Sequence, residues 1–142
     1  MRYLVVLIFG LTSSHALSQL RAPQLKDNTI YIVSKSSGDT LFSEVGKRLA
    51  KAGFPLTTAN KEFGQIATGE KIVTDYHYSY YVVVLIEGNK AIVKPIITND
   101  LVLGTHRWYY IDRKVTVNYK LMNHLLSALN GIGEVGFGRE PE

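Results

Sequence analysis

Residues Tyr76–Thr98 decide the fold, and after Tyr76 and His77 they read YSYYVVVLI-EGNK-AIVKPIIT. Two runs of β-branched and aromatic residues flank a Gly88-Asn89 loop, a pattern typical of a β-hairpin with Glu87 opposite Lys90. This register gathers apolar residues on one face, which we expect to face the core: Tyr80, Val82, Val84, Ile86, Ala91, Val93 and Ile97. The other face includes a lysine, so we expect it to contact water at least partly: Tyr81, Val83, Leu85, Ile92, Lys94 and Ile96.

The segment before the hairpin predicts a strand, a helix and further strands. Thr29–Ser34 is β-branched and alternates in polarity, as a strand does. Thr40–Ala52 carries apolar residues at helical spacing, with Asp39 as the candidate N-cap and Gly53 placed to end the helix. In Leu56–Thr74, threonine and isoleucine recur among glycines, which predicts one or two strands with a bulge or a hairpin.

The segment after the hairpin predicts one more strand, a helix and a tail. Arg107–Val117 reads RWYYIDRKVTV and has strand character. Asn118 is the candidate cap of a helix over Tyr119–Asn130, because leucines recur there on one face. Gly133–Glu142 is rich in glycine and charge, so we expect a flexible tail whose deletion changes little.

The expected element order is β-α-β-β-β-β-α. Two amphipathic helices can cover one face of an antiparallel sheet of four to five strands, so the expected fold is a single α+β domain, a two-layer sandwich over Thr29–Ile132. Pro95 cannot donate a ladder hydrogen bond, which predicts that its strand lies at an edge or bulges there. An edge strand leaves pairing with another chain open.

Composition narrows the classes of function. The chain has 142 residues, no cysteine and a formal net charge of +4. These values suit one domain and exclude a disulfide framework, a thiolate metal site and a cysteine nucleophile. The charge is too small and too scattered for a nucleic-acid footprint. No motif in the sequence predicts a cofactor or a resident metal.

The N-terminus has the layout of a secretory signal peptide over Met1–Ser18. Arg2 precedes a short apolar run, and small residues follow, with cleavage expected after Ser18 or after Ala16. A buried N-terminal strand is the alternative interpretation. We therefore expect an exported chain, periplasmic or secreted, with a polar tether over Gln19–Asn28. Charged residues interrupt every later apolar stretch, so no transmembrane segment is predicted after the leader.

The order of elements resembles small exported bacterial domains with a TBP-like or helix-grip fold, and is similar in layout to the C-terminal domains of the lipoprotein BamC. The matching residues are a helix ending in K-x-G-F (Lys51, Gly53, Phe54), followed by F-G-x-I-x-T over Phe63–Thr68. The chain lacks the lipobox cysteine and the second domain copy of BamC. The resemblance implies a sheet that packs around a helix, and it implies no catalytic residues.

Three patterns could carry chemistry, and each has a plainer interpretation. Gly131–Gly136 spells G-x-G-x-x-G, but a helix precedes it, which favours a helix end running into the tail. Asp75 and His77, with His106 or His124, could form a metal site or an acid–base pair of a small hydrolase, or could be surface polar residues. Backbone N–H groups of Ser36–Asp39 could bind an anion, although N-capping by Asp39 explains that segment.

Aromatic and basic residues give the candidate binding site. They stand on the outward face of the hairpin and around the single tryptophan: Tyr81, His106, Arg107, Trp108, Tyr109 and Arg113. Such residues stack sugars or anchor protein interfaces, although cross-strand packing also explains them. The expected function is a non-enzymatic exported module that binds a protein partner or a small ligand in the cell envelope. The alternatives are the small hydrolase or metal-dependent enzyme, and a binder of carbohydrate or a small apolar ligand between sheet and terminal helix.

Overall fold

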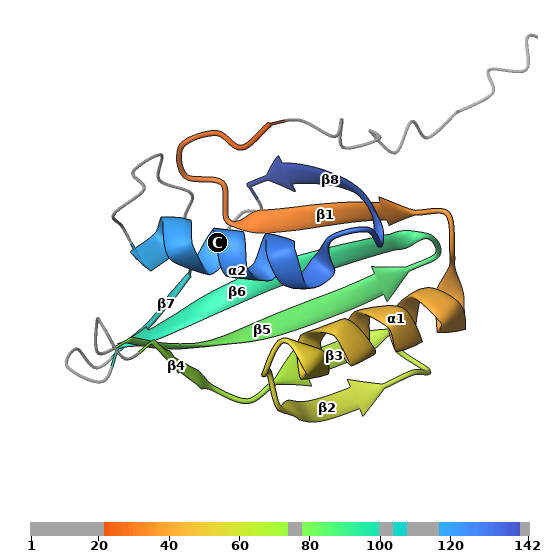
Figure 1. Ribbon diagram of the computed structural model, residues 1–142, viewed down its shortest axis with the longest axis horizontal. Coiled ribbons are helices and arrows are strands. Elements are labelled where there is room, and N and C mark those ends of the chain that lie inside the picture. Colours follow the sequence, from red (N-terminus) through yellow and green to blue (C-terminus); the bar gives the residue numbers. More distant parts are fainter. Residues whose placement is uncertain (1–21, 74–77, 100–103, 108–116, 140–142) are drawn as a thin grey trace, which may run out of the picture.

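The computed structural model describes residues 22–73, 78–99, 104–107 and 117–139. These residues form a mixed α+β fold with two helices, α1 (Gly38–Lys51) and α2 (Val117–Leu129) (Figure 1). The strands are β1 (Thr29–Ser34), β2 (Leu56–Asn60), β3 (Gln65–Thr68), β4 (Lys71–Val73), β5 (Tyr78–Glu87), β6 (Lys90–Asn99), β7 (Gly104–Arg107) and β8 (Gly133–Gly138).

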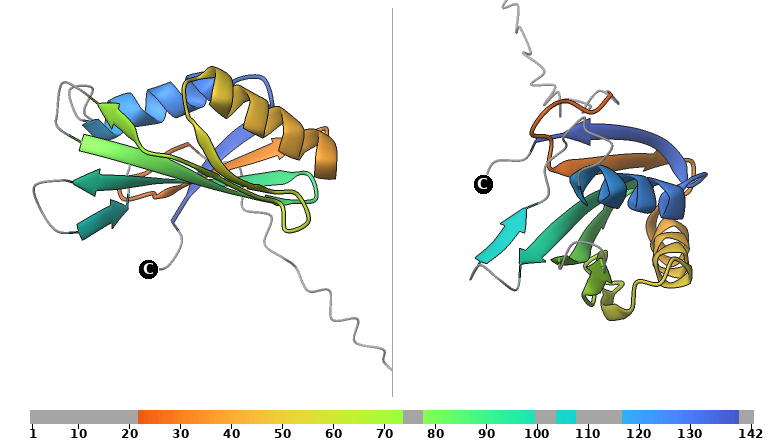
Figure 2. Two further views of the ribbon diagram at one scale, coloured as in Figure 1. Left: turned by 90° about the horizontal axis from the view of Figure 1, so that it is seen from below. Right: turned by 60° about the vertical axis from the view of Figure 1, so that its left-hand side comes forward.

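The eight strands belong to one sheet in which every pairing is antiparallel. The order is β2-β3-β5-β6-β1-β8, while β4 lies alongside β5 and β7 alongside β6. Both helices lie on the same face of this sheet (Figure 2). The sheet has more strands than the expected four to five. The short strands β4 and β7 pair with β5 and β6 beyond the ends of β3 and β1, and the segment expected to be a tail forms β8.

The long hairpin of β5 and β6 forms in the predicted register. Glu87 pairs with Lys90 across the Gly88-Asn89 loop, and the ladder continues to Tyr78 opposite Asn99. Side chains along both strands alternate between buried and half-buried, so the predicted core face and the predicted partly wet face are confirmed. The residues of the loop and the period of two were sufficient to fix this part of the fold.

Pro95 lies inside the sheet and not on an edge strand, because β6 has β5 on one side and β1 and β7 on the other. The pairing with β1 ends at Val93, and the pairing with β7 begins at Ile96. Counting from the hydrogen-bonded pair beside the hairpin loop, the Pro95 nitrogen faces away from β5. It therefore faces the gap between the end of β1 and the start of β7. No strand pairs with Pro95 on that side, so the missing N–H does not interrupt a ladder.

Gly133–Gly138 forms strand β8, so the expectation of a flexible tail is wrong for these residues. The strand pairs with the whole length of β1, from Ser34 opposite Gly133 to Thr29 opposite Gly138. Its glycines allow close approach: a Cβ on Gly133 would lie 2.2 Å from the carbonyl oxygen of Val33. A Cβ on Gly138 would lie 2.5 Å from the ring of Tyr31, which covers it.

Two predicted helix caps are also corrected. The N-cap of α1 is Ser37, not Asp39, and its side chain makes no capping hydrogen bond. The carboxylate of Asp39 instead pairs with Lys61 at 2.6 Å. Asn118 lies within α2 and not before it, since this helix begins at Val117. Gly53 has a φ of 83° just beyond the C-cap of α1, as the sequence predicts.

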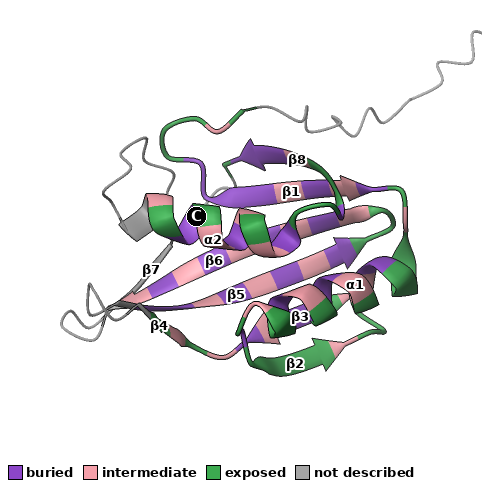
Figure 3. Cartoon of the chain, viewed as in Figure 1, coloured by how far each residue is buried: buried purple, intermediate pink, exposed green. Residues whose placement is uncertain are grey.

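Buried residues lie along the central strands and on both helices (Figure 3), and their side chains form one hydrophobic core. Phe54 is its largest fully buried side chain and lies directly after α1. Leu41, Val45 and Leu49 of α1 and Leu125 of α2 are fully buried, as is Val82 on β5. The core therefore consists of the helical stripes and the hairpin face that the sequence indicates.

Gly64, in the turn between β2 and β3, should tolerate substitution less well than Gly88 in the hairpin loop. Its φ is 62°, and a Cβ there would lie 2.4 Å from the carbonyl oxygen of Ile86. Gly88 is a matched control, since its φ is 60° and a Cβ there meets nothing within 4 Å. Gly88→Ala should cost about 1–2 kcal/mol, and Gly64→Ala at least about 1 kcal/mol more, measured by urea unfolding. Equal losses would mean that the contact with Ile86 is absent.

Candidate functional site

The face of the sheet opposite the helices carries the candidate site. We call it the helix-free face and define it by the half-buried residues that point away from the core: Tyr31, Val33, Ala67, Tyr81, Val83, Leu85, Ile92, Lys94 and Ile96. Strand alternation brings them to one side, because each neighbour along the strand is buried. Apart from its two tyrosine hydroxyls and Lys94, this set is apolar. A contiguous apolar surface of this kind is typical of interaction sites.

A hollow of about 330 Å³ lies on the helix-free face. Its lining comes from β2 and β3 (Thr58, Gln65–Ala67) and from β5 and β6 (Val83–Leu85, Ile92, Lys94). Ala67 stands opposite Val83, and its small side chain leaves space between the larger residues on either side. The hollow therefore offers an apolar floor with an amide, a hydroxyl and an ammonium group on its walls.

The register brings two of the predicted binding residues together. Tyr81 pairs with Ile96, and Ile96 pairs with Arg107, so these positions form one row across β5, β6 and β7. His106 belongs to the next row, opposite Ile97 on the core side of β6. Trp108, Tyr109 and Arg113 lie outside the described residues, so the tryptophan part of the site stays a prediction.

The residues proposed for an enzyme are only partly placed. Asp75 and His77 lie outside the described residues, and His106 is placed by its backbone register alone. The ring of His124 lies against Lys71 and Phe54. Within the described ranges, no three histidine, aspartate or glutamate side chains gather closely enough to hold a metal ion.

The structure places both backbone motifs that the sequence suggested as ligand sites. The N–H of Gly38 at the start of α1 donates to the carbonyl of Gly88 at 2.9 Å, which occupies a group proposed for an anion. In the G-x-G-x-x-G sequence, Gly131 has a φ of 82° and follows α2, while Gly133 and Gly136 belong to β8. Within the described residues, the last two glycines lie in a strand and not before a helix N-terminus, which differs from the geometry of a dinucleotide site.

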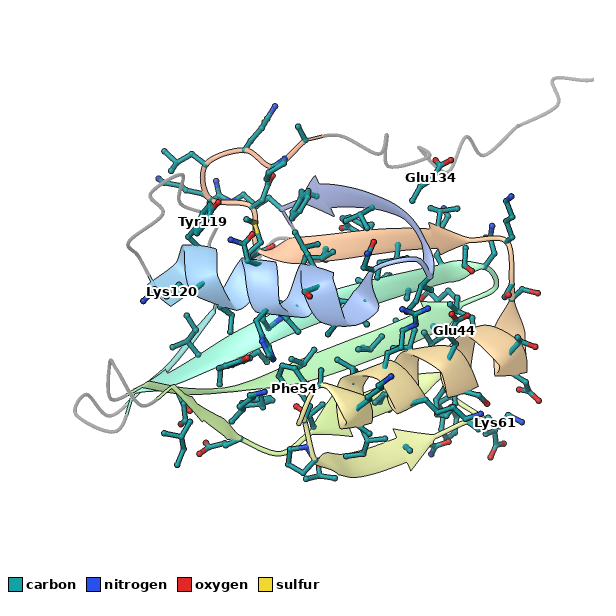
Figure 4. All side chains as sticks on the ribbon, viewed as in Figure 1. Glu44, Phe54, Lys61, Tyr119, Lys120 and Glu134 are labelled. Atoms are coloured by element: carbon teal, nitrogen blue, oxygen red, sulfur yellow. The ribbon has the colours of Figure 1, made fainter. Side chains whose placement is uncertain are left out.

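A cluster on the other face was not predicted from the sequence. Lys71 Nζ donates to the carbonyl oxygen of Ala52 at 2.7 Å and lies 3.0 Å from Nε2 of His124. It also stands 4.7 Å from the centroid of the Phe54 ring, a residue labelled in Figure 4. We call these four residues the Lys71–His124 junction. The Ala52 carbonyl is at the C-cap of α1, so the ammonium group of Lys71 caps that helix.

The junction shifts the pKa of both basic groups. Burial lowers the pKa of Lys71. Burial also lowers the pKa of His124, and the charge of Lys71 lowers it further, while the Ala52 carbonyl acts in the opposite direction. Tyr80, which packs edge-on against Phe54 at 5.5 Å, has a pKa raised by burial.

Arg48 of α1 makes a related contact at the end of α2. Its guanidinium donates to the carbonyl oxygen of Asn130 and pairs with Glu44 at 3.1 Å. The last turn of α2 has no basic residue of its own. Arg48 therefore supplies a positive charge next to the negative end of the helix dipole, which stabilises this end of α2. Each helix thus has a C-terminal carbonyl capped by a basic side chain of another segment.

The sequence matches no protein-family model, and a search of curated proteins finds no significant relative. Among the described residues, neither helix is long and apolar enough to cross a membrane. The resemblance to helix-grip domains and to BamC therefore stays a prediction.

Proposed function

We propose that the protein is a non-enzymatic exported module that binds a protein partner through the helix-free face. The supporting observation is the apolar surface of β1, β5 and β6, which lies on the side of the sheet away from both helices (Figure 2). Protein interfaces bury apolar and aromatic side chains at their centre, and Tyr81 and Leu85 are of this kind. The signal-like Met1–Ser18 supports export, and the placement of both helices on one face supports a two-layer, helix-grip-like layout.

A second candidate is a small apolar ligand or a carbohydrate held in the hollow. Its volume of about 330 Å³ falls within the range of known ligand sites, and its floor is apolar. The expected position between sheet and α2 is less suitable, because fully buried side chains such as Leu125 and Phe54 fill that space. Comparing the native and denatured masses of the exported protein distinguishes the candidates by the size of the mass that only the native sample carries, because a retained small ligand adds far less mass than a bound protein or second subunit.

Leu85→Glu tests the protein-binding proposal. A carboxylate at the centre of the helix-free face should abolish partner capture, because an apolar interface cannot solvate a buried charge. Ser127→Glu is the charge-matched control, since Ser127 is exposed on α2. The chain is expressed with its own leader in a Gram-negative host. A photoreactive residue at position 83 then cross-links bound proteins in the parent, in Leu85→Glu and in Ser127→Glu.

We expect discrete adducts in the parent and in Ser127→Glu, and none in Leu85→Glu. Circular dichroism should show that all three chains are folded, because residue 85 is only half-buried. Adducts that survive in Leu85→Glu, or vanish equally in both variants, would refute the assignment of this face. An uncleaved leader would refute the export part of the proposal separately.

A further inference from the structure

We propose that the Lys71–His124 junction is a pH-sensitive contact: protonation of His124 separates its ring from Lys71 and releases β4 and the end of α1 from α2. The junction joins three segments that are distant in sequence. Ala52 follows α1, Lys71 is the first residue of β4, and His124 lies in α2. The inference is independent of the function proposed for the helix-free face.

The hydrogen-bond chemistry requires a neutral histidine. An ammonium group has only donors, so Nε2 of His124, at 3.0 Å from Nζ, must accept and must carry no proton. Protonation turns this nitrogen into a donor. Two cationic groups then face each other at hydrogen-bond distance, and the contact between them becomes repulsive.

Among the surroundings of the ring, the Ala52 carbonyl favours protonation, but burial and the charge of Lys71 outweigh it, so the pKa of His124 is lowered. Phe54 is fully buried and its ring lies 5.4 Å from that of His124, so it provides an apolar wall. From β5, Tyr80 is the titratable side chain behind Phe54, and it stays neutral because burial raises its pKa. On α2, Lys120 is one turn before His124 and adds no negative charge. Lys71 is the charged group that acts on the ring within the described ranges.

Strand β4 is well suited to respond, because it is only three residues long and its recorded pairing is with β5 alone. The ammonium group of Lys71 is its link to the helices through Ala52 and His124. Loss of the His124 contact leaves the hydrogen bond to Ala52 and three cross-strand pairs with β5 to hold the strand, none of which joins it to α2. Local opening of such an edge requires far less free energy than global unfolding.

The direction of the pH effect follows from linkage. The pKa of His124 is lowered in the folded state, so between its folded value and its ordinary value the unfolded or opened chain binds more protons. The stabilising contribution is complete above the ordinary histidine pKa of about 6.5 and is lost as the pH falls below it.

Hydrogen exchange at about pH 7.5 and about pH 5 tests the inference. Rates are divided by their intrinsic values, which removes the general effect of pH. The amides to follow are Gly53 and Phe54, which donate to Ala50 and Leu49 at the end of α1. Their protection should fall several-fold at the lower pH, while that of Ser34, which donates to Asn89 far from the junction, stays constant.

His124→Gln is the matched variant, since its side-chain carbonyl can accept from Lys71 at either pH and does not titrate. We expect the several-fold change to vanish in it. Lys71→Gln keeps a donor for Ala52 but removes the charge, so the imidazole signals of His124 should titrate at a higher pH than in the parent. The inference is overturned if the parent's His124 titrates at or above the ordinary value, or if the change in protection persists in His124→Gln.

Discussion

A chain that ends at Ile132 is expected to lose at least about 4 kcal/mol of its free energy of unfolding relative to the full chain. Deletion of Gly133–Glu142 removes the buried ring of Phe137, and burial of one such ring alone contributes about 3–5 kcal/mol. It also removes the whole ladder between β8 and β1. Since small domains are stable by only about 5–15 kcal/mol, urea unfolding should begin at or near zero denaturant.

The matched control ends at Arg139 and keeps β8 intact. It should unfold at the same urea concentration as the full chain, within about 0.5 kcal/mol. Gly133→Ala should give an intermediate loss, because a Cβ at this position collides with the backbone of Val33. If the chain ending at Ile132 is as stable as the control, β8 does not belong to the sheet.

Leu125→Ala is expected to lower the free energy of unfolding by about 2–5 kcal/mol. Leu125 is fully buried on the face of α2 that covers the sheet. Removing its side chain loses the burial energy of three carbon atoms and leaves a cavity among side chains that are themselves held in place by the core. Chemical denaturation with a shared m-value measures the loss.

Ser127→Ala is the control on the same helix, because Ser127 is exposed. Its effect should stay within about 0.5 kcal/mol. A loss below about 0.5 kcal/mol for Leu125→Ala itself would contradict the packing of α2 on the sheet. A large loss in both variants would contradict the exposure of Ser127, because alanine has the highest helix propensity and does not itself weaken a helix.

Local patterns were sufficient for the parts of the fold whose contacts are close in sequence. The hairpin register followed from two loop residues and a period of two, and the two helices followed from apolar spacing. Strand β8 did not follow, because GEVGFG has the composition of a loop and its partner is at the other end of the domain. Its glycines serve close backbone approach to β1, a requirement that a single sequence does not reveal.

The same distinction applies to the candidate site. Alternation along the hairpin is sufficient to place Tyr81 and Lys94 on the partly wet face. The hollow could not be predicted, since it depends on how β3, with its small Ala67, lies against Val83. The contact of Lys71 with His124 joins residues 53 positions apart and depends on where α2 crosses β4.

The pairing of β1 with β8 has a consequence for biosynthesis. The ribosome produces the first strand of the sheet early, but both of its neighbours come later, β6 after the hairpin turn and β8 last of all. Until Gly133–Gly138 have emerged from the ribosome, β1 cannot complete its ladder, so completion of the sheet must follow their synthesis. A nascent chain stalled before Gly133 should remain sensitive to protease along its whole length, including the segment that was synthesised first.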